Sequence, residues 1–519
     1  MNDAQLPLNL AFVLPPIWLV AYSGHRPRAG DDARSEAALE ACRASIRREL
    51  ELLAARAREL KGTIELVGGV AEGADVIFLE TAAELGLGAH LILTTPVTDM
   101  EKGWALRASA LLARTKSPES GWTAREMSGV DPDIYSEVNA AMLEVADVVL
   151  AVYAEDDENQ PPLSGGTGDL LRVAAALPRE IPRVVIDPRR PGALIEKRET
   201  LKRDEGFELL WSLNRELFAL DPERLRRGRA GQAADIPDYL RGLDQVAVEH
   251  SVKFRRMLVG MLVLNASAAT LLSIYSEFGG GLVSCGLLVM GLLLSLAPPA
   301  LLAYVKHAAS RRQWRRFRFA AELAASIHWK KVGLLDRLEC LDERFDGKWR
   351  RLMLAVALGR QKETSAPSIE DPLREYRQGR IEGQRKYFEA QAGRVRKWYR
   401  VPSVGLSLTS ALSMTATIIG LFAFGVVEMD TPPVKYSVAA ATSLLGLSNL
   451  CAALMMALDA PRRRERYLTM SAQLEQLDAR LELVPTPTAR RDSVRRVEML
   501  LGTELLEWSA AGEILDLLQ

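Results

Sequence analysis

The chain has 519 residues, which is too many for one hydrophobic core and enough for two to four domains. Its 66 basic residues are balanced by 67 acidic residues, so no net charge recruits nucleic acid or anionic lipid, although the charges are unevenly placed. The four cysteines lie far apart and show no CxxC spacing, which argues against a zinc site or a disulfide framework and is typical of a reducing compartment. The first residues lack a basic n-region and a long apolar h-region, so we expect no cleaved signal peptide.

Residues 17–190 alternate between apolar runs and helical patterns. The predicted strands are IWLVAYSG, TIELVGG, AHLILTTP, DVVLAVYA and RVVID, and the predicted helices cover residues 33–60, 74–85, 135–145 and 170–177. Near-continuous apolar strands indicate a parallel sheet that is covered on both faces. Ligands bind to such sheets outside the carboxyl ends of the strands.

Three unusual loops fall at those strand ends. SGHR ends the first strand, GGVAEGAD follows the second, and SGGTGD follows the fourth after an acidic loop. Two of these loops open helices, whose unpaired N–H groups and positive dipole ends suit a phosphate, and Arg26 adds a permanent cation. The candidate ligand-binding residues are Ser23, Gly24, His25, Arg26, Gly68, Gly69, Glu72, Gly73, Asp75, Ser164, Gly165, Gly166, Thr167 and Gly168. Taken singly, each motif is also typical of an ordinary turn, a helix start or a satisfied loop histidine. No metal site is predicted, no catalytic residue is assigned and no cofactor is certain.

These three motifs, in this order, resemble the SLOG superfamily of Rossmann-like domains over roughly residues 17–190. The resemblance implies a nucleotide-derived ligand, such as an ADP-ribose-like molecule or a cyclic oligonucleotide. Some members cleave N-glycosidic bonds and carry a glutamate after a PGGxGTxxE loop. Here Ser164 stands at the proline position, Asp169 at the threonine position and Arg172 at the glutamate position. The resemblance therefore favours a sensor, with a nucleotide N-glycosidic hydrolase that uses Glu72 or Asp169 as the alternative.

Four stretches without charged residues follow in two close pairs. They are Met257–Ser276, Leu282–Val305, Val401–Val427 and Tyr436–Leu458. Each meets the roughly 20 apolar residues that a bilayer core demands of a helix, so each pair predicts a transmembrane hairpin. A buried helix of a globular domain could account for one such stretch, but four stretches in two close pairs favour membrane spans. Exit helices are expected over residues 334–341 and 474–483.

Basic residues flank both hairpins on the same side. The hairpin tips carry acidic residues with Lys435 as their one cation. The positive-inside rule therefore places both termini and the central segment in the cytoplasm. The membrane expected is the inner membrane. The third span carries a hydroxyl stripe at Ser403, Ser407, Ser410, Ser413 and Thr417. Such a stripe indicates tight helix–helix packing or, if several copies assemble, the wall of a pore.

The hairpins with their basic flanks look like the SLATT family of two-helix membrane modules, present twice. The fold class expected is α/β: a Rossmann-like parallel sheet followed by an all-α membrane region of four transmembrane helices in two hairpins with cytosolic helices. The expected domains are a tail (1–16), the SLOG-like domain (17–200), a helical linker (201–245), a first module (246–345), a connector (346–384), a second module (385–484) and a helical tail (485–519). Together the two resemblances imply a ligand-controlled, membrane-perturbing or pore-forming effector of bacterial antiphage defence, homo-oligomeric and without a nucleic-acid partner. A scaffold whose head has lost its ligand is a third interpretation.

Overall fold

The computed structural model places the chain in two compact units. The head unit is formed within Met1–Gly242, Leu323–Lys331 and Leu335–Ile369, and the helical unit within Leu243–Glu322, Val332–Leu334 and Glu370–Gln519. The residues that the structure describes are 14–28, 30–94, 100–117, 120–127, 134–154, 166–179, 181–197, 201–220, 236–277, 289–291, 293–294, 310–332, 335, 340–341, 343–345, 347–358, 372–426, 432–458, 460–484 and 486–517.

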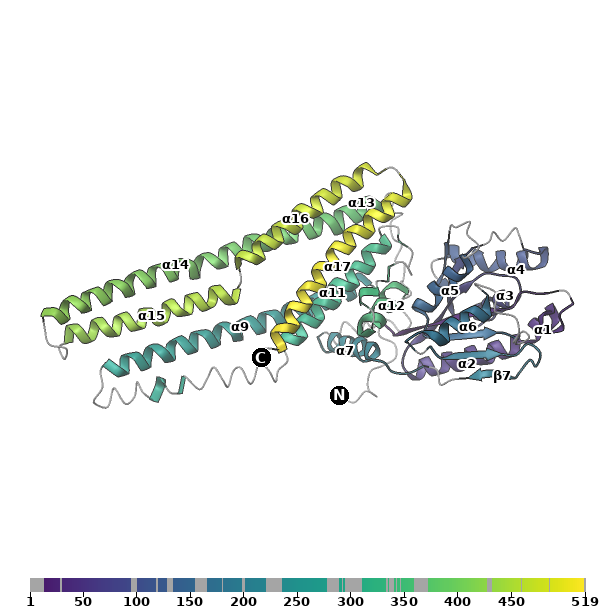
Figure 1. Cartoon of the computed structure of the whole chain (residues 1–519), viewed down its shortest axis with the longest axis horizontal. Helices are drawn as coiled ribbons and strands as arrows, with labels where there is room; N and C mark the ends of the chain where they lie inside the picture. The colour runs from purple at the N-terminus through teal and green to yellow at the C-terminus, as the bar shows by residue number, and fades with distance from the viewer. Residues whose placement is uncertain are drawn as a thin grey trace. The chain divides into compact units, whose positions relative to one another are not determined.

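The head unit is built on a seven-stranded sheet with the order β4-β3-β2-β1-β5-β6-β7 (Figure 1). The strands are β1 (Ile17–Gly24), β2 (Thr63–Gly69), β3 (Gly88–Leu93), β4 (Trp122–Glu126), β5 (Val148–Val152), β6 (Arg183–Ile186) and β7 (Leu194–Lys197). All neighbours are parallel except β6 and β7. The expected α/β fold with a mostly parallel sheet is confirmed for this unit. The sequence analysis missed β4 and β7, because both are edge strands that lack a continuous apolar run.

Helices pack on the sheet and supply the core. They are α1 (Glu36–Ala41), α2 (Arg43–Glu59), α3 (Ala74–Glu84), α4 (Lys102–Ala113), α5 (Ile134–Val145), α6 (Thr167–Ala176) and α7 (Glu205–Leu220), with short 3-10 turns η2 (Asp32–Arg34) and η4 (Arg114–Lys116). The fully buried Ile46, Leu50 and Phe78 pack with Tyr22 in the core. The single helix predicted over 33–60 is divided at Cys42, which ends α1 and precedes α2.

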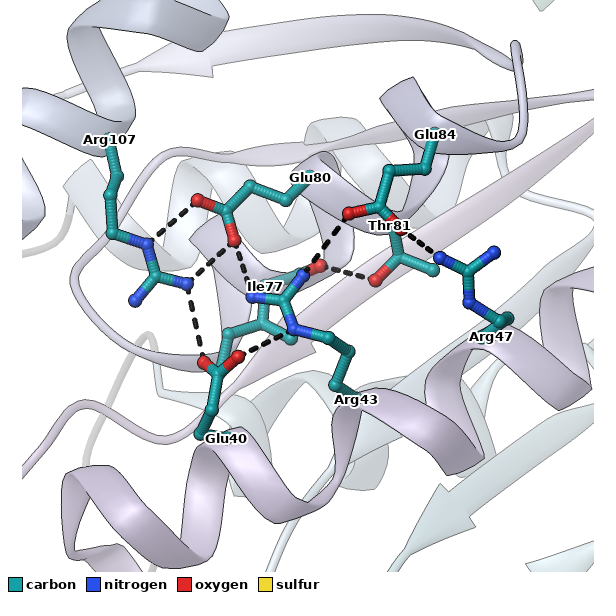
Figure 2. Close-up of polar contacts among 8 residues, drawn as sticks. All are labelled: Glu40, Arg43, Arg47, Ile77, Glu80, Thr81, Glu84 and Arg107. Carbon is teal, nitrogen blue, oxygen red and sulfur yellow. Dashed lines mark hydrogen bonds and ion pairs between the residues drawn. The ribbon is translucent and has the colours of Figure 1, made fainter.

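An ion-pair network joins α1, α2, α3 and α4 over one face of the sheet (Figure 2). Arg107 donates to both oxygens of Glu80, at 2.7 and 2.6 Å, and Arg43 donates to Glu80 at 2.5 Å and to Glu40 at 2.6 Å. Burial works to raise the pKa of Glu80, but the hydrogen bonds from Arg107 and Arg43 outweigh it and hold that pKa below its ordinary value. The network thereby fixes α3, whose first turn lies at the candidate site.

A late segment of the chain completes the head unit at the opposite, amino end of the strands. Helix α12 (Arg350–Leu358) follows the short turns η6 (Glu343–Phe345) and η7 (Gly347–Trp349) and is buried along its whole length from Arg351 onward. The Arg351 guanidinium donates to Ile17 O at 2.9 Å and to Asp147 Oδ2 at 2.8 Å. It also donates to Asp204 Oδ2 at 2.6 Å. Part of the range assigned to a connector therefore contributes to the head.

The helical unit contains the long helices. They are α9 (Ile236–Glu277, mostly in this unit), α11 (Ser310–Val332, through Glu322), α13 (Pro372–Tyr376), α14 (Gly383–Val426), α15 (Pro432–Leu458), α16 (Ala460–Leu483) and α17 (Pro487–Leu517), and a π-helical turn, η8 (Arg377–Glu382), joins α13 to α14. Figure 1 shows α14 and α15 as an antiparallel pair. The expected exit helix over 474–483 lies within α16, whereas the described residues of 334–341 lie outside helices.

Hydropathy singles out one membrane-crossing candidate within the described parts of the chain. The helical stretch Pro372–Ile419 is long and apolar enough to cross a bilayer, with a mean hydropathy of 1.3 in its most apolar window. Val259–Leu272 and Tyr436–Ala452 are shorter apolar helical stretches. The predicted span over residues 282–305 lies almost entirely outside the described residues.

Candidate functional site

The candidate ligand site lies where the strand order of the head reverses. β1 has β2 on one side and β5 on the other; β3 and β4 continue the sheet beyond β2, and β6 and β7 beyond β5. The carboxyl ends of β1 and β5 therefore flank the topological switch point, at which sheets of this kind bind ligands. Ser23, Gly24 and His25 lie at this point.

The loop after β2 folds back onto the end of β1. Asp75 Oδ1 accepts a hydrogen bond from Gly24 N at 3.0 Å, and His25 O accepts one from Ala74 N at 3.2 Å. Asp75 is buried, and this burial raises its pKa to about 7, although the hydrogen bond from Gly24, the charge of Arg26 and a hydrogen bond from Ala71 N act against the rise. The N-terminus of α3 thus already carries a carboxyl group of the chain itself.

The glycines around this loop have different structural roles. A Cβ at Gly24 would lie 2.2 Å from Ala74 Cβ, and a Cβ at Gly68 would lie 2.6 Å from Tyr22 Cζ. Gly73 has φ +92° and would place a Cβ 2.6 Å from His25 O, so these three glycines are needed by the fold itself. At Gly69 the nearest atom to a Cβ is Asp75 Oδ2 at 3.6 Å, an ordinary contact. Gly69 alone among the four leaves room beside Asp75.

His25 joins the ends of β1 and β5. Its Nε2 accepts a hydrogen bond from Ala154 N at 2.8 Å, and its ring stacks on Tyr153 with the centroids 5.1 Å apart. Burial, with the nearby charge of Arg34, lowers the pKa of His25 to about 4. The ring is therefore neutral at pH 7 and positions the two strand ends.

Helix α6 approaches the end of β1 from the other side. Ser23 Oγ and Thr167 Oγ1 lie 2.9 Å apart, and Asn139 of α5 donates to Gly166 O at 3.2 Å. Gly166 is the N-cap residue of α6 and provides no side-chain cap, so the first turn of α6 presents backbone N–H groups. This is the helix N-terminus that best suits an anion.

Arg26 is the cation of the site. It is exposed, its Nη2 donates to Tyr135 OH at 3.3 Å, and its guanidinium carbon lies 5.4 Å from the centre of that ring. A guanidinium held against an aromatic ring keeps N–H groups for a phosphate or carboxylate.

The structure brings most of the predicted residues together. Gly168 lies in the first turn of α6, and Glu72 is half-buried in the turn before Gly73, whereas Ser164 and Gly165 lie outside the described residues. The sequence analysis missed Tyr135, Asn139 and Tyr153, whose roles depend on contacts across the sheet edge. No local motif signals these three residues.

The residues of the hydrolase alternative are differently placed. Asp169 is 5 % exposed and forms an ion pair with Arg172 one helical turn later. A carboxylate that is buried and neutralised in this way is poorly placed to stabilise a developing charge on a substrate.

The helical unit has a second candidate surface, the outward side of α14. Val401, Val404 and Met414 are 75, 65 and 67 % exposed. Two hydroxyl groups contact α15 instead: Ser410 Oγ lies 2.7 Å from Ser448 Oγ, and Ser413, which is buried, donates from Oγ to Ala441 O at 2.9 Å, whereas Ser407 and Thr417 of the predicted stripe are exposed. This arrangement supports the packing interpretation of the hydroxyl stripe at Ser410 and Ser413.

Small residues allow the close approach of these helices. A Cβ at Gly405 of α14 would lie 3.0 Å from Cys451 Sγ of α15, and one at Gly446 would lie 3.8 Å from Thr270 Oγ1 of α9. Small residues and hydroxyl groups between helices, with apolar side chains outside, are typical of packing in lipid.

The chain was compared with protein-family models, with curated proteins and with solved structures, and no match was found in any of the three comparisons.

Two substitutions test the candidate ligand site. Arg26→Ala removes the exposed cation, and Gly69→Ala places a methyl group beside Asp75 without a steric conflict in the fold. Because a hydrogen bond to a charged group contributes about 1.5–3 kcal/mol, Arg26→Ala is expected to weaken binding of a phosphate-bearing ligand, for which ADP-ribose serves as the probe, by about ten- to a hundredfold. Gly69→Ala is expected to weaken it less. Calorimetry on the full-length protein in detergent measures both.

Matched controls are Arg58→Ala, an exposed arginine of α2, and Gly103→Ala, a position of α4 with nothing within 4 Å of the new Cβ. Both controls should bind like the wild type. If Arg26→Ala and Gly69→Ala also bind like the wild type, the ligand site lies elsewhere.

Proposed function

We propose that the protein is a ligand-sensing membrane effector. In this proposal the head binds a nucleotide-derived signal, ADP-ribose-like or a cyclic oligonucleotide, at the carboxyl ends of β1 and β5. The bound signal controls a membrane-perturbing or pore-forming region made of two transmembrane hairpins, as in bacterial antiphage defence. The four spans, the homo-oligomeric state and the inner-membrane location with both termini in the cytoplasm belong to the same proposal, as do the resemblances to SLOG and SLATT modules.

The observation that carries the membrane part is the orientation of side chains on α14. A helix pair in water would turn apolar side chains inward and hydroxyl groups outward, since apolar surface costs about 25 cal/mol per Å² to expose. In α14 and α15 the side chains of Thr409, Ser413 and Ser448 are buried, while Val401, Val404 and Met414 are exposed. This inversion favours a surrounding lipid phase.

The head part of the proposal is supported by the set of groups around the end of β1. Arg26 provides a cation, the first turn of α6 provides N–H groups, and Gly69 leaves room for a small group beside Asp75. These groups match the phosphate and sugar parts of a nucleotide. Ligand binding can shift the membrane region from its inactive to its active conformation only if the ligand's contacts with the head differ between these two conformations.

Vesicles with an entrapped dye test the proposal. The full-length protein, reconstituted into vesicles, is expected to release the dye when ADP-ribose or a cyclic oligonucleotide is added, and not when NAD or nucleoside monophosphates are added alone. Chromatography of the same samples measures free base. Glu72→Gln and Asp169→Asn should leave dye release unchanged. Production of free base that Glu72→Gln abolishes, without dye release, would establish the N-glycosidic hydrolase instead.

A further inference from the structure

Seven exposed cations lie in two helices of the helical unit, directly beside the apolar stretches. They are Arg394, Arg396, Lys397 and Arg400 of α14 and Arg462, Arg463 and Arg464 of α16, and we call them the basic collar. Glu465 is the one acidic residue in the stretches 394–400 and 462–465. Within the described part of the chain, no ion pair connects a collar residue to a carboxylate.

Other arginines of α16 and of the adjoining turn η8 have carboxylate partners. Arg377 donates to Asp478 at 2.7 Å, Arg380 to Glu498 at 3.0 Å and Arg466 to Glu504 at 2.6 Å. Within the helical unit, arginines that lie between packed helices are therefore neutralised by carboxylates. The collar is a group of exposed cations whose charge is left for a partner outside the described chain.

The two halves of the collar follow each other along one antiparallel pair of helices. Arg377 contacts Asp478, and Phe388 stacks on Tyr467 with the ring centroids 5.9 Å apart. The step from 377 to 388 matches the step from 478 to 467, so α14 and α16 run antiparallel in register. Residues 462–464 consequently lie beside residues 391–393 of α14, directly before Arg394.

The collar ends where the outward apolar surface begins. Arg400 is followed in α14 by Val401, which is 75 % exposed, and α16 follows α15 after one intervening residue. If α14 and α15 lie in hydrocarbon, the collar lies at the depth of the lipid phosphates.

We propose that the basic collar binds the headgroups of anionic phospholipids, so that the second hairpin selects anionic lipid at its cytoplasmic surface. This inference rests on the proposed membrane insertion. A juxtamembrane lysine or arginine near an anionic surface strengthens binding by about fivefold, and the attraction falls within a Debye length as salt is raised. The total charge of the chain is close to zero and gives no indication of this local excess of basic residues.

Thermal unfolding of the full-length protein in neutral detergent tests the lipid selectivity. Added phosphatidylglycerol is expected to raise the midpoint by several degrees at low salt, whereas phosphatidylcholine and free glycerol phosphate are not. The rise should shrink in 0.5 M salt. The variant Arg394→Gln/Arg396→Gln/Arg400→Gln/Arg463→Gln should lose most of it. The control variant Arg58→Gln/Lys102→Gln/Lys116→Gln/Arg190→Gln, with four exposed head cations removed, should keep it.

Insertion is measured separately, as resistance of the protein to alkaline extraction from phosphatidylcholine vesicles. A protein that inserts but responds equally to both lipids would refute the lipid selectivity and leave the proposed function intact. If the head variant loses the response to phosphatidylglycerol as fully as the collar variant, the response depends on the total charge of the protein, and this outcome would also refute the proposed selectivity of the collar. A protein extracted from every vesicle would refute the proposed insertion, and this inference with it.

Discussion

Glu498→Leu is expected to lower the free energy of unfolding of the helical unit by about 3–5 kcal/mol, because it leaves a buried cation without its hydrogen-bonded carboxylate. Arg380 is 3 % exposed and donates from Nε and Nη2 to the two oxygens of Glu498, each at 3.0 Å. Tyr376 also donates to Glu498, at 3.0 Å. Denaturant titration in mild detergent, followed by far-ultraviolet circular dichroism, measures the loss.

Two controls separate this loss from a general effect of the substitution. Glu482→Leu removes a partner of Arg377 that is 67 % exposed, and it should cost less than 1 kcal/mol. The double variant Arg380→Met/Glu498→Leu should recover most of the stability, since a buried ion pair can be replaced by apolar residues at little cost. A loss below 1 kcal/mol in Glu498→Leu would show that the pair is not buried in the folded protein.

The pair also joins three parts of the helical unit that are far apart in the sequence. Arg380 belongs to the π-helical turn η8 and Glu498 to α17, and Arg380 also lies 3.6 Å from Glu322 of α11. The helix that follows the first predicted hairpin and the helix that enters the second are thus joined through one guanidinium.

The sheet and its carboxyl edge could be predicted from the sequence because their signals are local. The runs IWLVAYSG and TIELVGG match β1 and β2 residue for residue, and Gly73 marks the start of α3 as expected. Edge strands such as β7, with exposed alternate positions, carry no such run.

Long-range contacts could not be predicted. Arg351 contacts Ile17 across 334 residues of sequence, so nothing near Arg351 indicates that it belongs to the head. The same limit applies within the site. The sequence analysis interprets GGVAEGAD as space for a ligand, yet Gly68 accommodates Tyr22 and Gly73 accommodates the His25 carbonyl. Of these glycines only Gly69 leaves room for another group, and which glycine does so depends on side-chain packing that the local sequence does not show.

The titration of Asp75 gives the head an unusual dependence of stability on pH. Its pKa is raised by burial from 3.8 in the unfolded chain to about 7 in the folded protein. Between pH 4 and 7 the unfolded chain therefore binds fewer protons at this group than the folded one, and stability falls as pH rises. A shift of about three units corresponds to about 4 kcal/mol at pH 8. His25 acts in the opposite sense over about pH 4–6.5, because its folded pKa is lowered.

Asp75→Asn isolates this contribution and links it to ligand binding. The amide keeps an oxygen for Gly24 N but carries no charge, so the variant should gain stability over the wild type between pH 6 and 8 and differ little at pH 4. A charged Asp75 repels the phosphate groups of the proposed ligand at the end of β1, so wild-type affinity for ADP-ribose should fall from pH 6 to pH 8, whereas the affinity of Asp75→Asn should stay nearly constant. Denaturant titration and calorimetry at pH 4, 6 and 8 give both quantities. Parallel stability curves for the two proteins would place the proton on another group, and a flat wild-type affinity would move the phosphate away from Asp75.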